Sequence, residues 1–308
     1  MPFFAAGMSS NLKYQFLLHF IVLIWGFTGI LGDLISLDYN EITFFRTGIA
    51  FLSLVVMGVF FPAKTSISKK QILWLLGTGV IVGLHWITFF YSIKISISIA
   101  VVCMSASTLF TSFLEPLIFK RKFLYSELVL SIIVLAGILI IFGFEFRYTL
   151  AIIVGLISAF FSALFNVLNG AFVQTMSSQT MTKYEMLGGF ITAAIFLLAT
   201  NNLDASTFYL SFEDWMWLLV LALVCTTFAF ITSIWVMKFV TPFTVSISVN
   251  MEPVYTIIIA LVVDYYRGTH KEQMSDGFYL GGSIIILAIF THAYLKTKKN
   301  RAQKRALN

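Results

Sequence analysis

Ten long apolar stretches set what this chain can fold into, because a helix needs about 20 predominantly apolar residues to cross a bilayer. The stretches cover residues 16–35, 41–61, 71–93, 95–119, 125–143, 149–174, 183–200, 214–237, 243–264 and 276–295. We therefore predict an all-α polytopic membrane protein with ten transmembrane helices.

The ten spans divide into five followed by five, which sets how the two halves relate. Since five is odd, a second half that repeats the first must insert upside down relative to it. A faint repeat is visible at an offset of 144 or 145 residues, where segments 90–94 and 109–111 correspond to 234–238 and 254–256. Two inverted five-helix repeats around a cavity at the membrane midplane are the usual architecture of a secondary transporter.

Composition leaves little chain outside the membrane. Of 308 residues, 59% are hydrophobic and 11% are charged, whereas soluble domains carry about 25% charged residues. Ten spans of about 20 residues use about 200 residues, so we expect no separate soluble domain. We expect a first repeat over 1–147, an inverted second repeat over 148–295 and a basic tail over 296–308.

The charged residues predict the orientation in the membrane. If the N-terminus is cytoplasmic, 15 of the 20 Lys and Arg residues fall on the cytoplasmic side. The opposite side is acidic and carries the two longest loops, 201–213 and 265–275. This asymmetry follows the positive-inside rule with both termini cytoplasmic. We interpret the basic tail as an anchor to lipid headgroups rather than a nucleic-acid site.

The sequence lacks the short motifs typical of common catalytic sites. It contains no His-Glu-x-x-His, no Gly-x-Ser-x-Gly and no phosphate-binding loop. We therefore expect neither an enzyme nor an ATP-driven pump, and no cofactor or metal. The sequence shows no filter motif typical of a channel. Cys103 and Cys225 both lie within spans, which argues against a disulfide framework.

Five short motifs carry a resemblance to one transporter family. They are Leu-Ile-Trp-Gly at 23–26, Phe-Phe-Arg-Thr-Gly-Ile-Ala at 44–50, Tyr-Ser-Ile-Lys at 91–94, Leu-Phe-Thr at 109–111 and Glu-Pro-Val-Tyr-Thr at 252–256. In this arrangement the chain resembles EamA-type transporters of the drug/metabolite transporter superfamily over nearly its whole length. The resemblance implies a ten-helix carrier of small metabolites in the bacterial inner membrane. Such carriers often handle amino acids and frequently work in the export direction.

Two positions depart from that family pattern. Thr108 stands where the family commonly has Pro before Leu-Phe-Thr, and Lys120-Arg121 replaces the usual Gly-Glu after the fourth span. If a family member uses that Glu, this chain cannot.

Glu252 is the strongest candidate for a residue that carries transport. A carboxylate at the bilayer centre costs roughly 2.5–3.5 kcal/mol on insertion scales, so its presence needs a reason. Pro253 beside it removes a backbone hydrogen bond and is predicted to kink the helix. A carboxylate at this depth can bind a substrate amine or take up a proton, and proton coupling is a hypothesis that rests on Glu252 alone. The alternative is a protonated or hydrogen-bonded Glu that holds helices together.

Amide and hydroxyl side chains offer further candidates. Asn250 and Glu252 point about 200° apart around a helix, so both line a cavity only if the kink bends the helix. Otherwise one of them forms hydrogen bonds between helices. On span six, one face carries Ser158, Ser162, Asn166 and Asn169. This stripe either lines a polar path for a zwitterion or forms interhelical hydrogen bonds. Asn166 is its better candidate because it is deep and bulky.

Arg46 on span two has two interpretations. It could hold a substrate carboxylate through two parallel hydrogen bonds. The sequence favours the other interpretation, in which Arg46 snorkels to the external interface or pairs with Asp33 or Glu41.

The remaining candidates are weaker. Trp25 lies too deep in its span for an interfacial belt, so it and Tyr91 are expected to shape the pocket. His85 could relay protons, although packing is its more usual role on an apolar helix. Glu115 is expected to pair with Lys120 or Arg121 at the inner edge. The Gly-x-x-x-Gly sequence at 79–83 indicates close helix packing.

Taken together, these features predict a secondary transporter of small metabolites such as amino acids, working by alternating access with possible proton coupling. Its expected partners are a small-molecule substrate and the lipid bilayer, and it is expected to be a monomer or homodimer that binds no nucleic acid. The alternative is a membrane-embedded enzyme or a scaffold without transport activity.

Overall fold

The computed structural model describes residues 12–62, 67–200, 205–267 and 275–307, and these residues form helices without any strand. The first half contains α1 (Leu12–Leu34), α2 (Tyr39–Phe60), α3 (Lys69–Ile95), α4 (Ile97–Cys103), η1 (Met104–Ala106), α5 (Ser107–Phe119) and α6 (Tyr125–Phe144). The second half contains η2 (Phe146–Tyr148), α7 (Thr149–Phe172), α8 (Ser178–Ala199), η3 (Ala205–Phe208), α9 (Phe212–Leu219), η4 (Val220–Phe228), α10 (Ala229–Val236), α11 (Pro242–Val249), α12 (Glu252–Arg267) and α13 (Asp276–Leu307).

Eight helical segments within the described residues are long and apolar enough to cross a membrane, and they coincide with the first eight predicted spans. Parts of the loops predicted at 201–213 and 265–275 lie outside the described residues. The tenth predicted span falls in α13, whose side chains are described only in part.

The ninth predicted span, 243–264, is not one continuous helix. It divides into α11 and α12, with Asn250 and Met251 between them. Pro253 follows the first residue of α12, where its missing N–H is tolerated because the first turn of a helix has no partner for it. The sequence predicts a kink at Pro253, and the structure shows a larger effect, because the helix is divided into α11 and α12.

Span four is one helical segment from Ile97 to Phe119, but its helix tightens at the matching place. A short 3-10 segment, η1, separates α4 from α5. Adding the repeat offset of 145 to Met104 gives 249, and adding it to Ala106 gives 251, so η1 corresponds to the break between α11 and α12. Both halves of the protein thus carry an irregular helical turn at the same position of their fold.

Glycine residues set the closest helix contacts. A Cβ on Gly79 of α3 would lie 2.9 Å from the Cα of Glu185 and 2.8 Å from the Cα of Gly188, both on α8. A Cβ on Gly137 of α6 would lie 2.8 Å from the carbonyl oxygen of Gly281 on α13. Since only glycine permits such approach, the predicted packing role of the 79–83 motif is confirmed.

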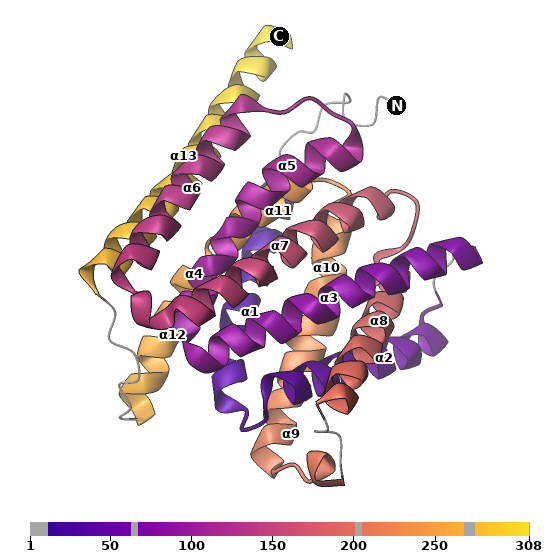
Figure 1. Cartoon of the computed structure of the whole chain (residues 1–308). Coiled ribbons are helices and arrows are strands. Elements are labelled where there is room, and N and C mark those ends of the chain that lie inside the picture. Colours follow the sequence, from indigo (N-terminus) through magenta and orange to yellow (C-terminus); the bar gives the residue numbers. More distant parts are fainter. Residues whose placement is uncertain (1–11, 63–66, 201–204, 268–274, 308) are drawn as a thin grey trace.

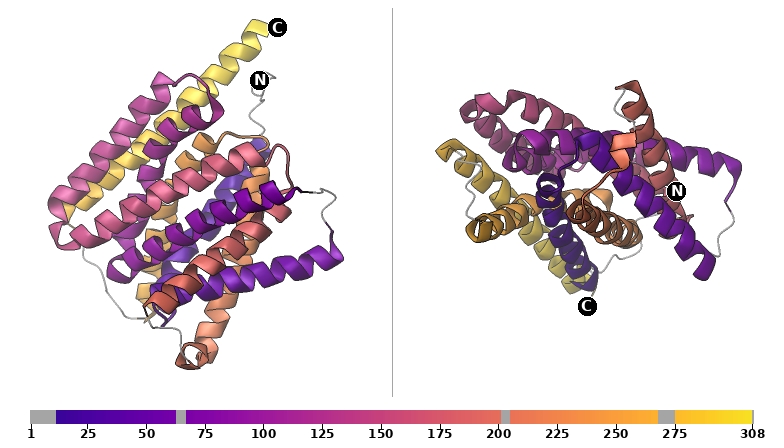
Figure 2. Two further views of the ribbon diagram at one scale, coloured as in Figure 1. Left: turned by 45° about the vertical axis from the view of Figure 1, so that its right-hand side comes forward. Right: turned by 90° about the horizontal axis from the view of Figure 1, so that it is seen from below.

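These contacts arrange the helices into a bundle with a partly separate edge. Helices α6 and α13 lie side by side along one edge, and α3 runs beside α7 and α8 in the larger group (Figure 1). The same arrangement is seen when the molecule is turned (Figure 2). Helices α3 and α8 belong to different halves, so the two halves are packed into each other rather than set apart.

Candidate functional site

A cavity of about 50 Å³ lies inside the larger helix group, where both halves contribute to its wall. Its lining residues are Trp25, Thr28, Arg46, His85, Trp86, Phe89, Met104, Ser162, Phe165, Asn166, Phe230, Val249 and Glu252. One water needs at least about 10–15 Å³ on this measure, so the cavity has room for a few water-sized groups. Six residues singled out from the sequence line it: Trp25, Arg46, His85, Ser162, Asn166 and Glu252.

The irregular turns of spans four and nine meet at this cavity. Met104 comes from η1, Val249 ends α11 and Glu252 begins α12. Helix breaks expose backbone groups that a continuous helix would satisfy, and in membranes they are tolerated where they face protein or a water-filled cavity. Glu252 also stands at the N-terminus of α12, where the helix dipole favours negative charge.

Arg46 reaches the cavity from α2 and is buried, with 2% of its surface exposed. Its Nε donates to the hydroxyl oxygen of Thr226 at 2.6 Å, and its guanidinium lies 3.9 Å from the ring centroid of Trp86. Its Nη1 is buried without a hydrogen-bond partner. The favoured interpretation of Arg46 as a snorkelling or interfacial residue is therefore wrong, because the side chain turns into the protein.

A π-helical segment explains how Arg46 is held. In η4, the Thr226 hydroxyl donates to the carbonyl of Leu221, five residues back, while it accepts from Arg46. The carbonyl of Cys225, next to it, accepts a hydrogen bond from the Trp25 indole at 3.1 Å. π-Helical turns are rare and occur often at functional sites. This one supplies partners to two residues that line the cavity.

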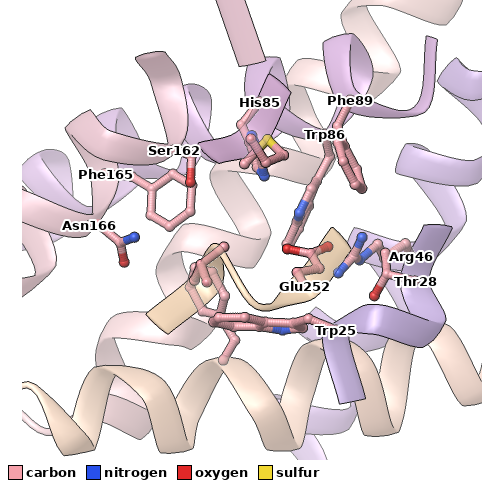
Figure 3. Close-up of a pocket in the computed structure, with 13 residues that line it drawn as sticks. Trp25, Thr28, Arg46, His85, Trp86, Phe89, Ser162, Phe165, Asn166 and Glu252 are labelled. Carbon is pink, nitrogen blue, oxygen red and sulfur yellow. The ribbon is translucent and has the colours of Figure 1, made fainter. Parts of the chain in front are cut away.

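The carboxylate of Glu252 points toward the guanidinium of Arg46 across one end of the cavity (Figure 3). The two groups interact electrostatically, yet no direct ion pair joins these two described residues. A buried charge is costly unless it is paired and hydrogen-bonded. The arrangement therefore places a guanidinium and a carboxyl group on either side of one space within the cavity.

Polar side chains line the side of the cavity opposite Arg46 and Glu252. Asn166 and Ser162 line the cavity from α7, together with Phe165 (Figure 3). His85 of α3 also faces the cavity, and its Nδ1 lies 3.0 Å from the carbonyl oxygen of Ser158, which can only accept a hydrogen bond. The Ser158 hydroxyl in turn donates to the carbonyl of His85 at 3.0 Å. His85 is thus fixed in orientation by α7.

Two predicted pocket residues lie outside the cavity lining. The Asn250 side chain accepts a hydrogen bond from the Thr108 hydroxyl at 3.2 Å, which joins α5 to the segment between α11 and α12. Of the pair considered from the sequence, Glu252 therefore faces the cavity and Asn250 acts between helices. Tyr91 packs against Tyr39, with ring centroids 4.7 Å apart, instead of shaping the pocket.

Glu115 joins the C-terminal end of α5 to the start of α11. Its Oε2 accepts the backbone N–H of Phe243, in the first turn of α11, at 2.7 Å. Its Oε1 pairs with Arg121 at 3.1 Å, and Arg121 also pairs with Glu127 at 2.7 Å. The expected pairing of Glu115 with Arg121 is confirmed, and the bond to Phe243 links the two halves.

One buried carboxylate escaped the sequence analysis. Glu185 of α8 is fully buried and its Oε2 accepts from the Asn169 side-chain amide at 3.3 Å. Its depth was hidden because the seventh span was predicted to begin at residue 183, whereas α8 begins at Ser178. A helix start at the Ser177 N-cap, whose side chain accepts the Thr180 N–H, is the signal that would have placed Glu185 about two turns into the span instead of at its edge.

Comparison with protein families supplies the last observation. The model of the EamA-like transporter family matches residues 12–143 and again residues 149–294, which together make up most of the chain. The chain belongs to the EamA-like transporter family. It is therefore a transporter-like, multi-pass membrane protein of two-repeat architecture, and the resemblance drawn from the five motifs is confirmed. Transport, rather than catalysis, is the activity of EamA members.

Comparisons with individual proteins add only the fold. No curated protein matches this chain. A solved crystal structure aligns with a TM-score of 0.66 over 90% of this chain and 95% of its own length, at 14% sequence identity. At this identity the likeness shows that the fold is shared, and nothing more.

Proposed function

We propose that this EamA member is a secondary carrier of small zwitterionic metabolites, amino acids above all, and that the cavity around Arg46 and Glu252 is its substrate site. In this site the Arg46 guanidinium binds the substrate carboxylate and the Glu252 carboxylate binds the substrate ammonium group. Its place is the bacterial inner membrane with both termini cytoplasmic, and its direction is export. The orientation is supported by the distribution of basic residues, and the direction by family resemblance.

One observation carries the assignment of the substrate class. Two buried groups of opposite charge line the same cavity and are not paired directly with each other. The guanidinium keeps a free donor in Nη1, and guanidinium–carboxylate hydrogen bonds are among the strongest in proteins. A zwitterion placed between the two groups would satisfy both charges at once, whereas a simple amine or a simple acid would satisfy only one.

The remaining lining limits what the site accepts. Trp25, Trp86 and Phe230 contribute aromatic walls, and Asn166 contributes an amide for a polar side chain. Since the cavity is about 50 Å³, a small polar head fits it directly and a bulky drug-sized molecule does not. Larger side chains require the helices around the cavity to separate.

Alternating access is supported by the construction of the site. Substrate sites of inverted-repeat carriers lie near the midplane between discontinuous helices, one from each repeat. Here η1 and the break between α11 and α12 both contribute residues to the cavity. We infer that one repeat rocks against the other around these breaks and exposes the cavity to each side of the membrane in turn.

Counterflow into proteoliposomes tests this function. The purified protein is reconstituted with a mixed internal pool of amino acids and small metabolites, and exchange is followed by mass spectrometry. We expect saturable exchange of a few zwitterions and none of their amine-only or acid-only analogues. Exchange confined to non-zwitterionic compounds, or none above protein-free liposomes, would contradict the proposal. The membrane-embedded enzyme or scaffold would then be the better account.

A further inference from the structure

We propose that Glu185, with Asn169, forms a proton-binding site separate from the substrate cavity, and that the proton bound there couples transport to a pH gradient. This inference rests on the proposed carrier function and names its coupling ion. It also moves the coupling role away from Glu252, which the substrate occupies.

The Glu185 carboxyl has few partners. It lies on α8 with none of its surface exposed, and its one hydrogen bond within the described residues comes from Asn169 of α7. Its Oε1 and the Oδ1 of Asn169 are both buried without a partner. Two neighbouring acceptors that lack a donor point to a missing positive charge, and a single proton on the carboxyl turns one acceptor into a donor.

Few ionisable side chains lie on α8 and on the helices packed against it. On α8 itself Lys183 and Tyr184 are half-buried and make contact with each other. The helices packed against α8 are α2, α3 and α10, and α7 reaches it through Asn169. Neither α7 nor α10 carries an ionisable side chain. The charged and histidine side chains on α2 and α3 are Glu41, Arg46, Lys69, Lys70, His85 and Lys94.

None of those groups supplies a counter-charge to Glu185. Arg46 and His85 are turned into the substrate cavity. Glu41 accepts the backbone N–H of Asp38, and Lys69, Lys70 and Lys94 are exposed. An isolated ionised carboxylate is strongly disfavoured in such surroundings, so Glu185 holds a proton in this conformation.

Glu185 lies where the two halves of the chain pack against each other. The backbone of α8 at Glu185 packs directly on Gly79 of α3, at a contact between the two halves of the chain. Rocking of the halves changes this contact, and with it the access of water to the carboxyl. Glu185 follows Ser178 by seven residues, which places it about 10 Å from the start of α8. A proton can therefore be held in one conformation and released when the helices separate.

A proton suits this site better than a metal cation. Hard cations take about six oxygen ligands, and the described residues offer no group of three or more acidic, His or Cys side chains that could hold a metal ion. A carboxyl and one amide are enough for a proton.

Transport measured in two modes tests the site. Counterflow needs only substrate binding and rocking, whereas accumulation driven by a pH gradient also needs the coupling proton. We expect Glu185→Gln to keep counterflow within about twofold of the wild type and to lose gradient-driven accumulation. Glu252→Gln should lose both. The exposed Glu213→Gln is the matched control and should keep both.

The outcomes separate failure of the inference from failure of the proposed function. If the wild type shows no counterflow, the carrier function fails. If it shows counterflow and Glu185→Gln still accumulates substrate along a pH gradient, or if a sodium gradient is what drives the wild type, the proton site is wrong.

Infrared spectroscopy gives a readout that does not depend on transport. The wild type should show a carboxylic-acid C=O band that disappears in Glu185→Gln. If that variant does not fold, Asn169→Leu should shift the same band, because it keeps the carboxyl and removes its hydrogen-bond partner. A spectrum that neither substitution changes would overturn the inference.

Discussion

The Nε of Arg46 donates to the hydroxyl oxygen of Thr226 at 2.6 Å, and this bond ties α2 in the first half to the π-helical segment η4 in the second. The bond fixes one edge of the guanidinium, and Trp86 covers its face at 3.9 Å. With two of its surfaces occupied, the guanidinium has a defined direction in which to meet a substrate. Preorganisation of this kind lowers the entropy lost on binding.

Replacing Thr226 with Val should weaken substrate binding without removing the positive charge. The valine leaves the buried Nε of Arg46 without its acceptor, which costs about 1–3 kcal/mol and reorients the side chain. We expect the apparent KM for counterflow to rise about tenfold, since 1.4 kcal/mol corresponds to a factor of ten. Thr227→Val is the control, because the Thr227 hydroxyl donates to Ala222 and lies beside Ser53 rather than Arg46.

Replacing Glu115 with Gln should weaken the contact between α5 and α11. The charged side chain accepts from the Phe243 backbone and pairs with Arg121, and each charge-assisted hydrogen bond contributes about 1.5–3 kcal/mol. We expect the thermal unfolding midpoint in detergent to fall by several degrees. Glu213→Gln, at an exposed position of α9, should leave it unchanged. Equal midpoints for the two variants would contradict a structural role for the Glu115 bonds.

Substitutions at two glycines of α3, Gly77 and Gly79, distinguish the effect of close helix packing from the effect of helix propensity. A Cβ on Gly79 would meet the backbone of α8, whereas a Cβ on Gly77 would meet nothing within 4 Å. Gly79→Ala should therefore destabilise the protein by about 1–3 kcal/mol through overpacking. Gly77→Ala should stabilise it by roughly 0.5–1 kcal/mol, because alanine restricts the unfolded chain more than glycine. Unfolding curves of the two variants that move in the same direction would show that α3 and α8 do not touch there.

The connection between α6 and α13 should weaken in acid. Burial raises the pKa of Glu145, but hydrogen bonds from Ser275 and the charge of Arg147 lower it more, so its pKa lies below the ordinary value. A lowered pKa means that the carboxylate stabilises the fold above the ordinary pKa of about 4.3. This stabilisation is lost as the pH falls through the lower, folded-state value.

Glu145→Gln tests this dependence. The difference in unfolding midpoint between the wild type and the variant should be largest near neutral pH and should shrink as the pH is lowered below 4. A difference that grows on acidification would mean that the folded protein raises the pKa of Glu145 instead.

Several features of the site could be predicted from the sequence because they depend on local chemistry. A carboxylate next to proline in an apolar run marks both a polar site and a helix break, and Glu252 and Pro253 occupy those roles. Trp25 was placed in the interior by its depth along α1, and it lines the cavity. The ten apolar runs were predicted by length, and the first eight coincide with helices that can span a membrane.

Features that depend on long-range contacts could not be predicted in this way. The interior position of Arg46 depends on its contact with η4, some 180 residues away in the sequence. The π-helical form of η4 does not follow from the hydropathy pattern. Asn250 and Glu252 share a short segment, and only the packing of α5 decides that Asn250 bonds to Thr108. Glu185 was overlooked because span boundaries are the least certain part of a hydropathy pattern.

The most direct test of the central claim is whether Arg46 and Glu252 bind opposite ends of one substrate. Binding of the transported amino acid, its methyl ester and its N-acetyl derivative to the purified protein is measured by calorimetry, in the wild type and in Glu252→Gln. In the wild type, each derivative should bind at least about tenfold more weakly, since each leaves one buried charge unpaired. In Glu252→Gln, discrimination against the N-acetyl derivative should disappear while discrimination against the ester remains. If Glu252→Gln still rejected the N-acetyl derivative as strongly as the wild type does, Glu252 would not be the group that binds the substrate ammonium.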